Sequence, residues 1–287
     1  MLGLVILTVM GCASLQAREE PERSTPTRPV WRSGAFEAHV QFFNGPDVGD
    51  RTAGMAGYEV AATYVSDHIR SFGLQPGLAR AWHLAHDTTT TEEGATVARA
   101  TGSVGVLQAP LEAHSVYGFV AGRSFELSDE LIIVCADLDA LRHPPDAVHL
   151  GAGTAALLEL AYQFSLYARY TYVPGTTLLF AVFSGARQDY QGVRDYLRHP
   201  LWPLRQTRSV LYLGPDLDTE ESLQALWEAA GVRLQIVRAP VDTLETTGDG
   251  AETSVSTAAR QALAIAERAH GILIRQASSY NIGKRAQ

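Results

Sequence analysis

Apolar side chains recur at three- and four-residue intervals along residues 57–73, which predicts an amphipathic helix. Gly73 stands where a helix stop is expected, directly after the last apolar position. The apolar positions are Tyr58, Ala61, Ala62, Val65, Ile69 and Phe72.

Further along the chain, short continuous apolar runs indicate buried strands. Residues 115–121, 130–136 and 176–183 are rich in β-branched and aromatic residues and are bounded by Gly, Pro or charged residues. A helix with little polar surface is predicted between the last two, over residues 153–169. The same reasoning predicts strands at 209–214 and 232–237 and helices at 218–231 and 252–275.

Strands that alternate with helices predict an α/β protein with three α/β/α layers. We expect a mostly parallel, mixed sheet with helices on both faces. The polar, threonine-rich residues 87–102 are expected to form an exposed loop or a ragged hairpin. Loop-like surroundings are also expected for His83, His86 and His143.

Composition is consistent with one large domain, predicted over residues 35–280. The 287 residues are 46% hydrophobic and 19% charged, enough to bury a full-sized core. The net charge of −8 argues against a nucleic-acid partner and against an anionic membrane surface.

The chain begins with an apolar run, residues 1–12, of signal-peptide length and too short to span a bilayer. Its end, Val9-Met10-Gly11-Cys12, resembles the cleavage box of bacterial lipoproteins, whose cysteine takes a lipid on its thiol. Residues 13–34 are polar and contain prolines, as in a flexible tether. We therefore expect a protein held in the bacterial cell envelope, at the periplasmic or outer-membrane face, by a lipid on Cys12. No Lys or Arg precedes the apolar run, and the alternative is a buried N-terminal strand.

Most common catalytic motifs are absent from the sequence. It contains no H-E-x-x-H, C-x-x-C, G-x-S-x-G or Walker lysine motif. Residues 151–156, GAGTAA, match a dinucleotide-binding pattern, but no strand directly precedes them and no acid ends the next strand. Cys135 would have no disulfide partner beside a lipidated Cys12, so we interpret it as a small buried hydrophobe.

Five segments in order resemble the zinc aminopeptidase family, which also includes glutaminyl cyclases, the transferrin-receptor ectodomain and nicastrin. They are RTAGMAGYEVAATYVSDHIRSFGLQPG, SVYGFVAGRSFELSDELIIVCADLDAL, HLGAGTAALLELA, GTTLLFAVFSGARQDYQGVRDYL and HPLWPLRQTRSVLYLGPD. The resemblance implies a zinc-peptidase fold of the phosphorylase/hydrolase-like type. We find no match for the family's last histidine, since His270 falls in a predicted helix, and a shortened C-terminal part is expected.

The resemblance also implies where two zinc ions would be held, and the expected ligands are changed. The first histidine position is Asp137, while Asp139 matches the aspartate that orients that histidine. The bridging aspartate is replaced by His149. The two glutamates are replaced by Ala186 and Arg187, and a methyl group or a protonated guanidinium cannot bind zinc or accept a proton.

The later aspartate of the family falls on Gly214, or on Asp216 if the alignment slips. Because shared ligands and base act together in a two-metal site, these changes predict a catalytically inactive member without cofactor. We further expect that Arg187 could pair with Asp137 or Asp139 in the old metal pocket.

Three functions remain open at this point. The first is a scaffold or protein- and peptide-binding subunit. The second is an aminopeptidase or cyclase-like hydrolase with a rearranged zinc site, for which Asp137, Asp139 and His149 could make a lone metal site. The third is a small-molecule binder that uses the carboxyl ends of the strands.

Overall fold

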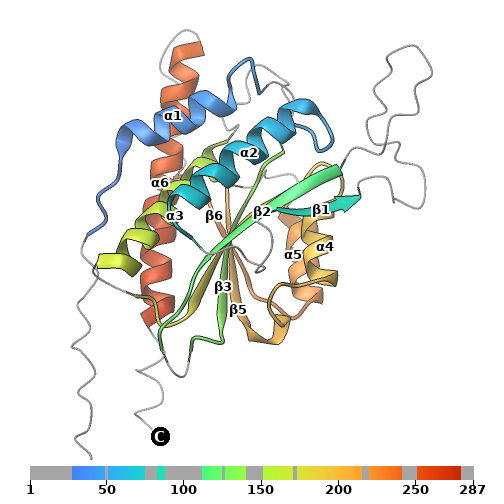
Figure 1. Cartoon of the computed structure of the whole chain (residues 1–287), viewed down its shortest axis with the longest axis vertical. Coiled ribbons are helices and arrows are strands. Elements are labelled where there is room, and N and C mark those ends of the chain that lie inside the picture. Colours follow the sequence, from blue (N-terminus) through green and yellow to red (C-terminus); the bar gives the residue numbers. More distant parts are fainter. Residues whose placement is uncertain are drawn as a thin grey trace, which may run out of the picture.

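A six-stranded mixed sheet forms the centre of the protein, in the order β1-β2-β4-β3-β5-β6 (Figure 1). The computed structural model describes residues 28–48, 51–74, 83–87, 112–124, 127–139, 151–170, 173–214, 220–240 and 251–278. The strands are β1 His83–Asp87, β2 Glu112–Val120, β3 Leu131–Asp137, β4 Thr177–Phe183, β5 Thr207–Leu213 and β6 Leu234–Val237. Strands β3 to β6 are parallel, whereas β2 runs antiparallel to β4 and β1 antiparallel to β2. The prediction of a mostly parallel, mixed sheet is confirmed.

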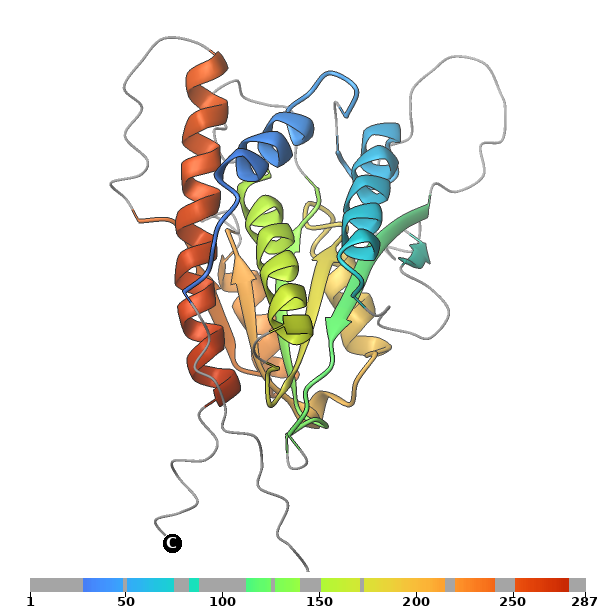
Figure 2. The ribbon, with the colours of Figure 1, turned by 60° about the vertical axis from the view of Figure 1, so that its left-hand side comes forward.

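Helices cover both faces of this sheet, as predicted (Figure 2). They are α1 Ser33–Phe43, α2 Ala56–Ser71, α3 Ala152–Tyr170, α4 Gln191–Arg198, α5 Glu220–Ala229 and α6 Ala251–Ser278, with a short 3-10 helix, η1, at Leu204–Gln206. Helices α1, α2, α3 and α6 share one hydrophobic core with the sheet, and α4 and α5 share a second core on the opposite face.

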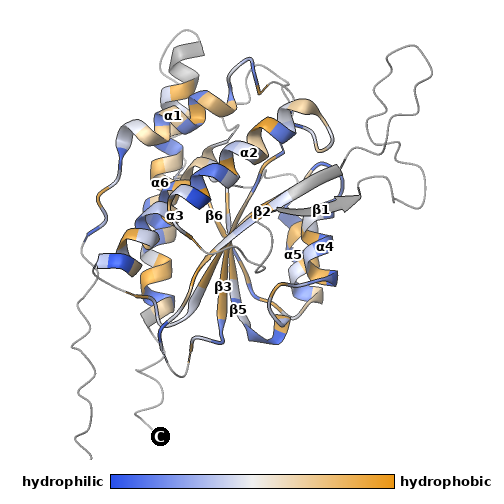
Figure 3. Ribbon diagram, in the orientation of Figure 1, coloured by the Kyte–Doolittle hydropathy of each residue, from blue (hydrophilic) through white to orange (hydrophobic). Residues whose placement is uncertain are grey.

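The strands supply these two cores alternately, because successive side chains of a strand point to opposite faces. In β3, Ile132 and Val134 belong to the α3 side, whereas Ile133 and Cys135 belong to the side of α4 and α5. Hydrophobic residues accordingly dominate the central strands, while the outer helices alternate hydrophobic and hydrophilic residues (Figure 3). Cys135 is fully buried, as the sequence predicted.

Three elements differ from the sequence predictions. Helix α1 begins at Ser33, inside the predicted tether 13–34, and α4 was not predicted. His83 and His86 lie in strand β1 rather than in a loop. Residues 88–102 of the predicted loop, and His143, lie outside the described residues.

Helix α3 is the most deeply buried helix element of the first core. Only its last two residues, Arg169 and Tyr170, are exposed. Gly153 lets this helix approach the sheet closely, since a Cβ there would lie 2.3 Å from the backbone oxygen of Leu213. Gly151 has φ +92, a conformation that favours glycine. Packing and backbone conformation therefore explain both glycines of the GAGTAA motif.

The buried helix α3 carries one acid, Glu159. Its partners are Arg32, the residue directly before α1, and His39, in α1. Arg32 donates to both carboxylate oxygens, through Nη2 at 2.5 Å and Nε at 3.2 Å. His39 Nε2 lies 3.2 Å from Oε1 of Glu159, and its Nδ1 lies 2.7 Å from the hydroxyl of Tyr64. Burial alone would raise the pKa of Glu159, but the hydrogen bonds and charges of His39 and Arg32 outweigh it and lower the pKa.

Arg32 also stacks on an aromatic ring, with its guanidinium carbon 3.6 Å from the ring centre of Tyr162. The segment before α1 is thereby fixed on the domain, next to α3 and α6. Trp31 contributes through edge contacts with Phe36 and His270. None of the described helices combines the length and the apolar character needed to cross a membrane.

We predict opposite effects for alanine at two helical glycines. Gly153→Ala should destabilise the fold by roughly 1–3 kcal/mol, because the new methyl group meets backbone that cannot move aside. Gly271→Ala in α6 is the matched control, since its Cβ would meet only the end of the Arg275 side chain at 3.5 Å. The control should gain about 0.5–1 kcal/mol from helix propensity. Urea unfolding gives the free energy of unfolding of both variants. An equal increase of this free energy in both would contradict the close approach of α3 to the sheet.

Candidate functional site

The positions singled out by the sequence gather at the carboxyl ends of β3, β4 and β5, the usual place for a site in an open α/β sheet. Asp137 ends β3, and Asp139 follows two residues later. Ala186 and Arg187 lie in the turn after β4, and Gly214 directly follows β5. His149 and Cys12 lie outside the described residues.

Asp137 is half-buried and held by two neighbouring elements. The hydroxyl of Tyr212, in β5, donates a hydrogen bond to its Oδ1. The backbone oxygen of Asp137 accepts a hydrogen bond from the hydroxyl of Thr154, in α3, at 2.7 Å. Burial, followed by the charge of Asp137, raises the pKa of Tyr212 well above its usual value, so the phenol keeps the proton that it donates.

Asp139 is buried against the turn that follows β4. Its Oδ1 accepts a hydrogen bond from the backbone N–H of Gly185 at 2.9 Å, while Oδ2 has no hydrogen-bond partner among the described residues. Burial and the nearby charge of Asp137 raise the pKa of Asp139 to about 8. The N–H groups of Gly185 and Arg187 and the charge of Arg51 oppose this rise without cancelling it.

Arg51 is the cation next to Asp139, and the sequence analysis did not identify it. Its buried guanidinium donates to the backbone oxygens of Leu138, at 3.1 Å, and Phe43, at 2.5 Å. Burial lowers the pKa of Arg51 to about 10, and Asp139 acts in the opposite direction. No local pattern could have revealed this neighbour, because Arg51 and Asp139 are far apart in the chain.

The turn after β4 presents Arg187 to the surface. Arg187 is exposed and Ala186 is half-buried. The turn is unusual because Asp189 and Tyr190 have φ of 54° and 56°, which costs free energy for residues with a side chain. Arg194 stabilises it through a hydrogen bond from Nε to the Asp189 backbone oxygen at 2.7 Å and a 2.6 Å ion pair with the Asp189 carboxylate.

The predicted ion pair of Arg187 with Asp137 or Asp139 stays a prediction. What the structure gives is a contact of the Arg187 backbone N–H with Asp139, and a charge effect on Asp139 from Arg51. His270 is remote from these residues, in α6, where its Nε2 lies 3.0 Å from the hydroxyl of Tyr167. Burial lowers the pKa of His270 to about 4.

The described donor set does not fit a pair of zinc ions. Ala186 and Gly214 offer no side-chain donor, Arg187 offers a cation, and Asp137 shares an oxygen with the phenol of Tyr212. Asp139 matches the aspartate that would orient a histidine, but Asp137 stands at the position of that histidine. Over the described ranges, no three His, Cys, Asp or Glu side chains come together as metal ligands.

Comparison with solved structures places the chain in the fold of zinc aminopeptidases and glutaminyl cyclases. A zinc aminopeptidase from Bacillus subtilis aligns over 85% of this chain and 96% of its own, with 11% identity and a TM-score of 0.56. A glutaminyl cyclase from an Acidobacteriales bacterium aligns over 91% and 98%, with 15% identity and a TM-score of 0.55. A Zn-dependent exopeptidase from Parabacteroides distasonis aligns over 84% and 99%, with 13% identity and a TM-score of 0.54.

These identities are too low to carry over an activity, so the likeness defines the fold alone. No protein-family model and no curated protein matches the sequence. The fold class predicted from the sequence is confirmed. The alignments extend over nearly the whole of each solved structure.

We predict that Asp139 makes the stability of the protein fall as the pH rises. Its carboxyl has a pKa of about 8 in the folded state, above the roughly 3.9 of an unfolded chain. Between those values the unfolded state has lost a proton that the folded state keeps, so unfolding becomes easier with rising pH. The side chain in Asp139→Asn cannot ionise. The free energy of unfolding of this variant, relative to that of the wild type, should therefore rise by roughly 1 kcal/mol for each pH unit from about 5 to 8.

Urea unfolding at several pH values measures the difference. Asp129→Asn is the control, because Asp129 is exposed at the opposite edge of the sheet and its substitution should leave the pH dependence unchanged. A gap between wild type and Asp139→Asn that stays constant with pH would contradict the prediction.

Proposed function

We propose that this protein is a catalytically inactive relative of the zinc aminopeptidases that serves as a scaffold or peptide-binding subunit. The fold is retained, and the observation that carries the proposal is the character of the side chains at the carboxyl ends of β3, β4 and β5. They present a methyl group, an exposed guanidinium and a glycine where the family resemblance implies acidic ligands.

Two-metal hydrolysis depends on all of its parts at once. The metals share and acidify a water, and a free carboxylate moves its proton. Ala186 and Arg187 put no carboxylate at the two positions after β4 where the resemblance implies one, and a methyl group or a guanidinium can perform neither task. Asp189, farther along the turn, pairs with Arg194 at 2.6 Å. One carboxyl oxygen of Asp139 accepts a hydrogen bond from the backbone of the β4 turn, and Arg51 lies near it as a positive charge.

A binding role uses the surface that remains. Arg187 is exposed and Asp137 half-buried at the same edge of the sheet, so this edge offers both signs of charge. Polar contacts of both signs give orientation and specificity to a bound peptide or protein loop. The strained turn at Asp189 and Tyr190 supports a functional role for this edge, since such strain is concentrated at functional sites.

We propose further that the protein is anchored in the bacterial cell envelope by a lipid on Cys12. The support comes from the sequence Val9-Met10-Gly11-Cys12, which resembles the lipoprotein cleavage box. Residues 28–32 run along the domain surface and are fixed there by Trp31 and Arg32. Anchor and domain would then be joined by residues 13–27, a shorter tether than the predicted 13–34.

Purified protein should retain less than stoichiometric zinc and show neither aminopeptidase nor cyclase turnover. Elemental analysis after incubation with zinc and dialysis gives the first quantity; release of N-terminal residues and cyclisation of N-terminal glutaminyl peptides give the second. The double substitution Ala186→Glu with Arg187→Glu should increase the retained zinc, because it returns two carboxylates to the turn after β4. Two zinc ions per wild-type chain together with turnover would refute the proposal and favour the hydrolase alternative.

Cys12→Ser should move the protein from the membrane fraction to the aqueous fraction of expressing bacteria. The reason is that the lipid on the thiol supplies most of the membrane affinity. Cys135→Ala is the matched control, since this buried thiol lies in the core and its loss should not change the distribution. Mass spectrometry of the N-terminal peptide checks the modification directly, and an unmodified Cys12 in membrane-bound protein would overturn the anchor.

A further inference from the structure

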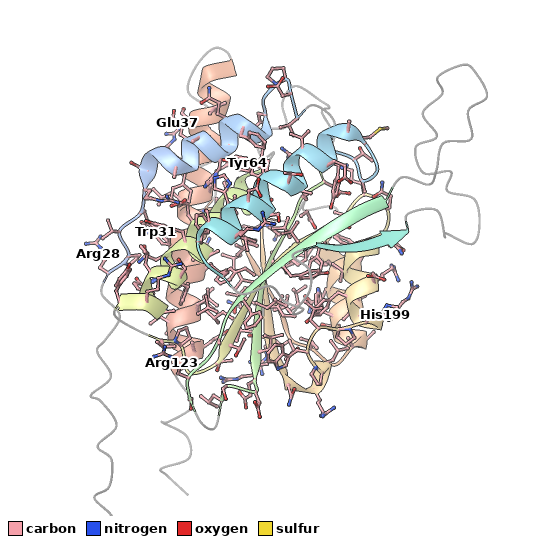
Figure 4. All side chains as sticks on the ribbon, in the orientation of Figure 1. Arg28, Trp31, Glu37, Tyr64, Arg123 and His199 are labelled. Atoms are coloured by element: carbon pink, nitrogen blue, oxygen red, sulfur yellow. The ribbon has the colours of Figure 1, made fainter. Side chains whose placement is uncertain are left out.

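Arginines gather at the end of the molecule opposite the candidate site, where the parallel strands begin. Arg205 lies in η1, just before β5, and Arg233 directly precedes β6. Arg123 follows β2, which is antiparallel to β4, and its backbone N–H donates to Pro174 just before β4. All three side chains are exposed. Arg123 is labelled at this end in Figure 4.

Three helices end at the same edge with an arginine in their last turn. These are Arg169 of α3, Arg198 of α4 and Arg275 of α6, and each is exposed. A cation at the C-terminus of a helix interacts favourably with the helix dipole, which is sufficient to explain the three helical arginines. Arg123 and Arg233 lie outside helices, so the dipole does not explain their positions. We call the set the arginine pole: Arg123, Arg169, Arg198, Arg205, Arg233 and Arg275.

Acidic residues offset this charge only in part. Asp129 and Glu228 are exposed acids at this end, and exposed Asp67, near the end of α2, pairs with Arg70 at 3.0 Å. Glu130 is half-buried and pairs with Arg208, with 3.1 Å between Oε2 and Nε. The pole is therefore positive, although the whole chain has a net charge of −8. Because salt screens charges beyond about 8 Å, a surface in contact with the pole responds to the local charge.

The N-terminal segment lies along one side of the domain. From α1 it runs beside α6 as far as about the middle of that helix (Figure 2). Arg28 and Trp31 lie along this path (Figure 4).

We propose that the arginine pole rests on anionic lipid headgroups and thereby orients the candidate site away from the membrane. The orientation rests on the proposed lipid anchor, whereas the affinity of the pole for anionic lipid does not. Two aromatic residues fit such a contact: Tyr170 is 75% exposed at the end of α3, and half-buried Trp202 donates to the backbone oxygen of Asp129 at 3.1 Å. Tyrosine and tryptophan favour the headgroup region of a membrane.

The test uses the full chain carrying Cys12→Ser, so that the pole is measured without the lipid. Binding is measured by co-sedimentation with vesicles of phosphatidylcholine alone and with vesicles that also contain phosphatidylglycerol. We expect stronger binding to the anionic vesicles and a loss of this preference when the salt concentration rises from about 0.05 M to about 0.5 M. Arg123→Gln with Arg233→Gln should weaken binding to the anionic vesicles roughly tenfold.

Arg187→Gln with Arg260→Gln is the charge-matched control, since both residues are exposed and lie away from the pole. It should change binding less than about twofold, because the screened charges do not reach the lipid. Equal binding to both kinds of vesicle, or equal weakening by both double substitutions, would overturn the proposal. The proposal would also be overturned if the protein bound an anionic polynucleotide but not the anionic vesicles. All variants carry the apolar residues 1–11. Any contribution of these residues to membrane binding therefore cancels when variants are compared by the ratio of their binding to anionic and to neutral vesicles.

Discussion

Helix α3 imposes the main physical constraint on this protein, because nearly every residue of it is removed from water. The sheet packs on one side of it, and α1, α2 and α6 pack around the rest. Close approach to β5 requires that Gly153 lack a side chain. A charged group on such a helix needs a partner inside the protein, since unpaired buried charge is costly.

Glu159 shows how that requirement reaches the N-terminal segment. An ionised carboxylate within α3 needs counter-charges and hydrogen bonds, which Arg32 and His39 provide. Breaking one side of this cluster would leave an uncompensated buried charge, so the segment before α1 is held in place by electrostatics as well as by packing. The position of residue 28 relative to the sheet is therefore a consequence of the chemistry of α3.

Much of the fold could be predicted from the sequence, because the core strands and α2, α3, α5 and α6 have strong hydrophobic patterns. Helix α4 escaped prediction because it is short and follows Asp189 and Tyr190, whose left-handed backbone has no glycine to signal it. Helix α1 escaped because the polar stretch before it suggested a tether. The positions of Asp137, Asp139, Ala186, Arg187 and Gly214 at one edge were foreseen through the family resemblance. The neighbour Arg51 was not, since a contact 88 positions away leaves no local pattern.

The edge of the sheet can change its chemistry while the core stays the same, because the two are held by different interactions. The strands are fixed by the two hydrophobic cores, whose residues end at Ala136 in β3 and Phe183 in β4. Asp139 and the β4 turn lie just beyond, where the backbone N–H of Gly185 and the charge of Arg51 offset part of the cost of burying the acid. A carboxyl with a raised pKa needs no metal to be tolerated at neutral pH, since it is stable in its protonated form.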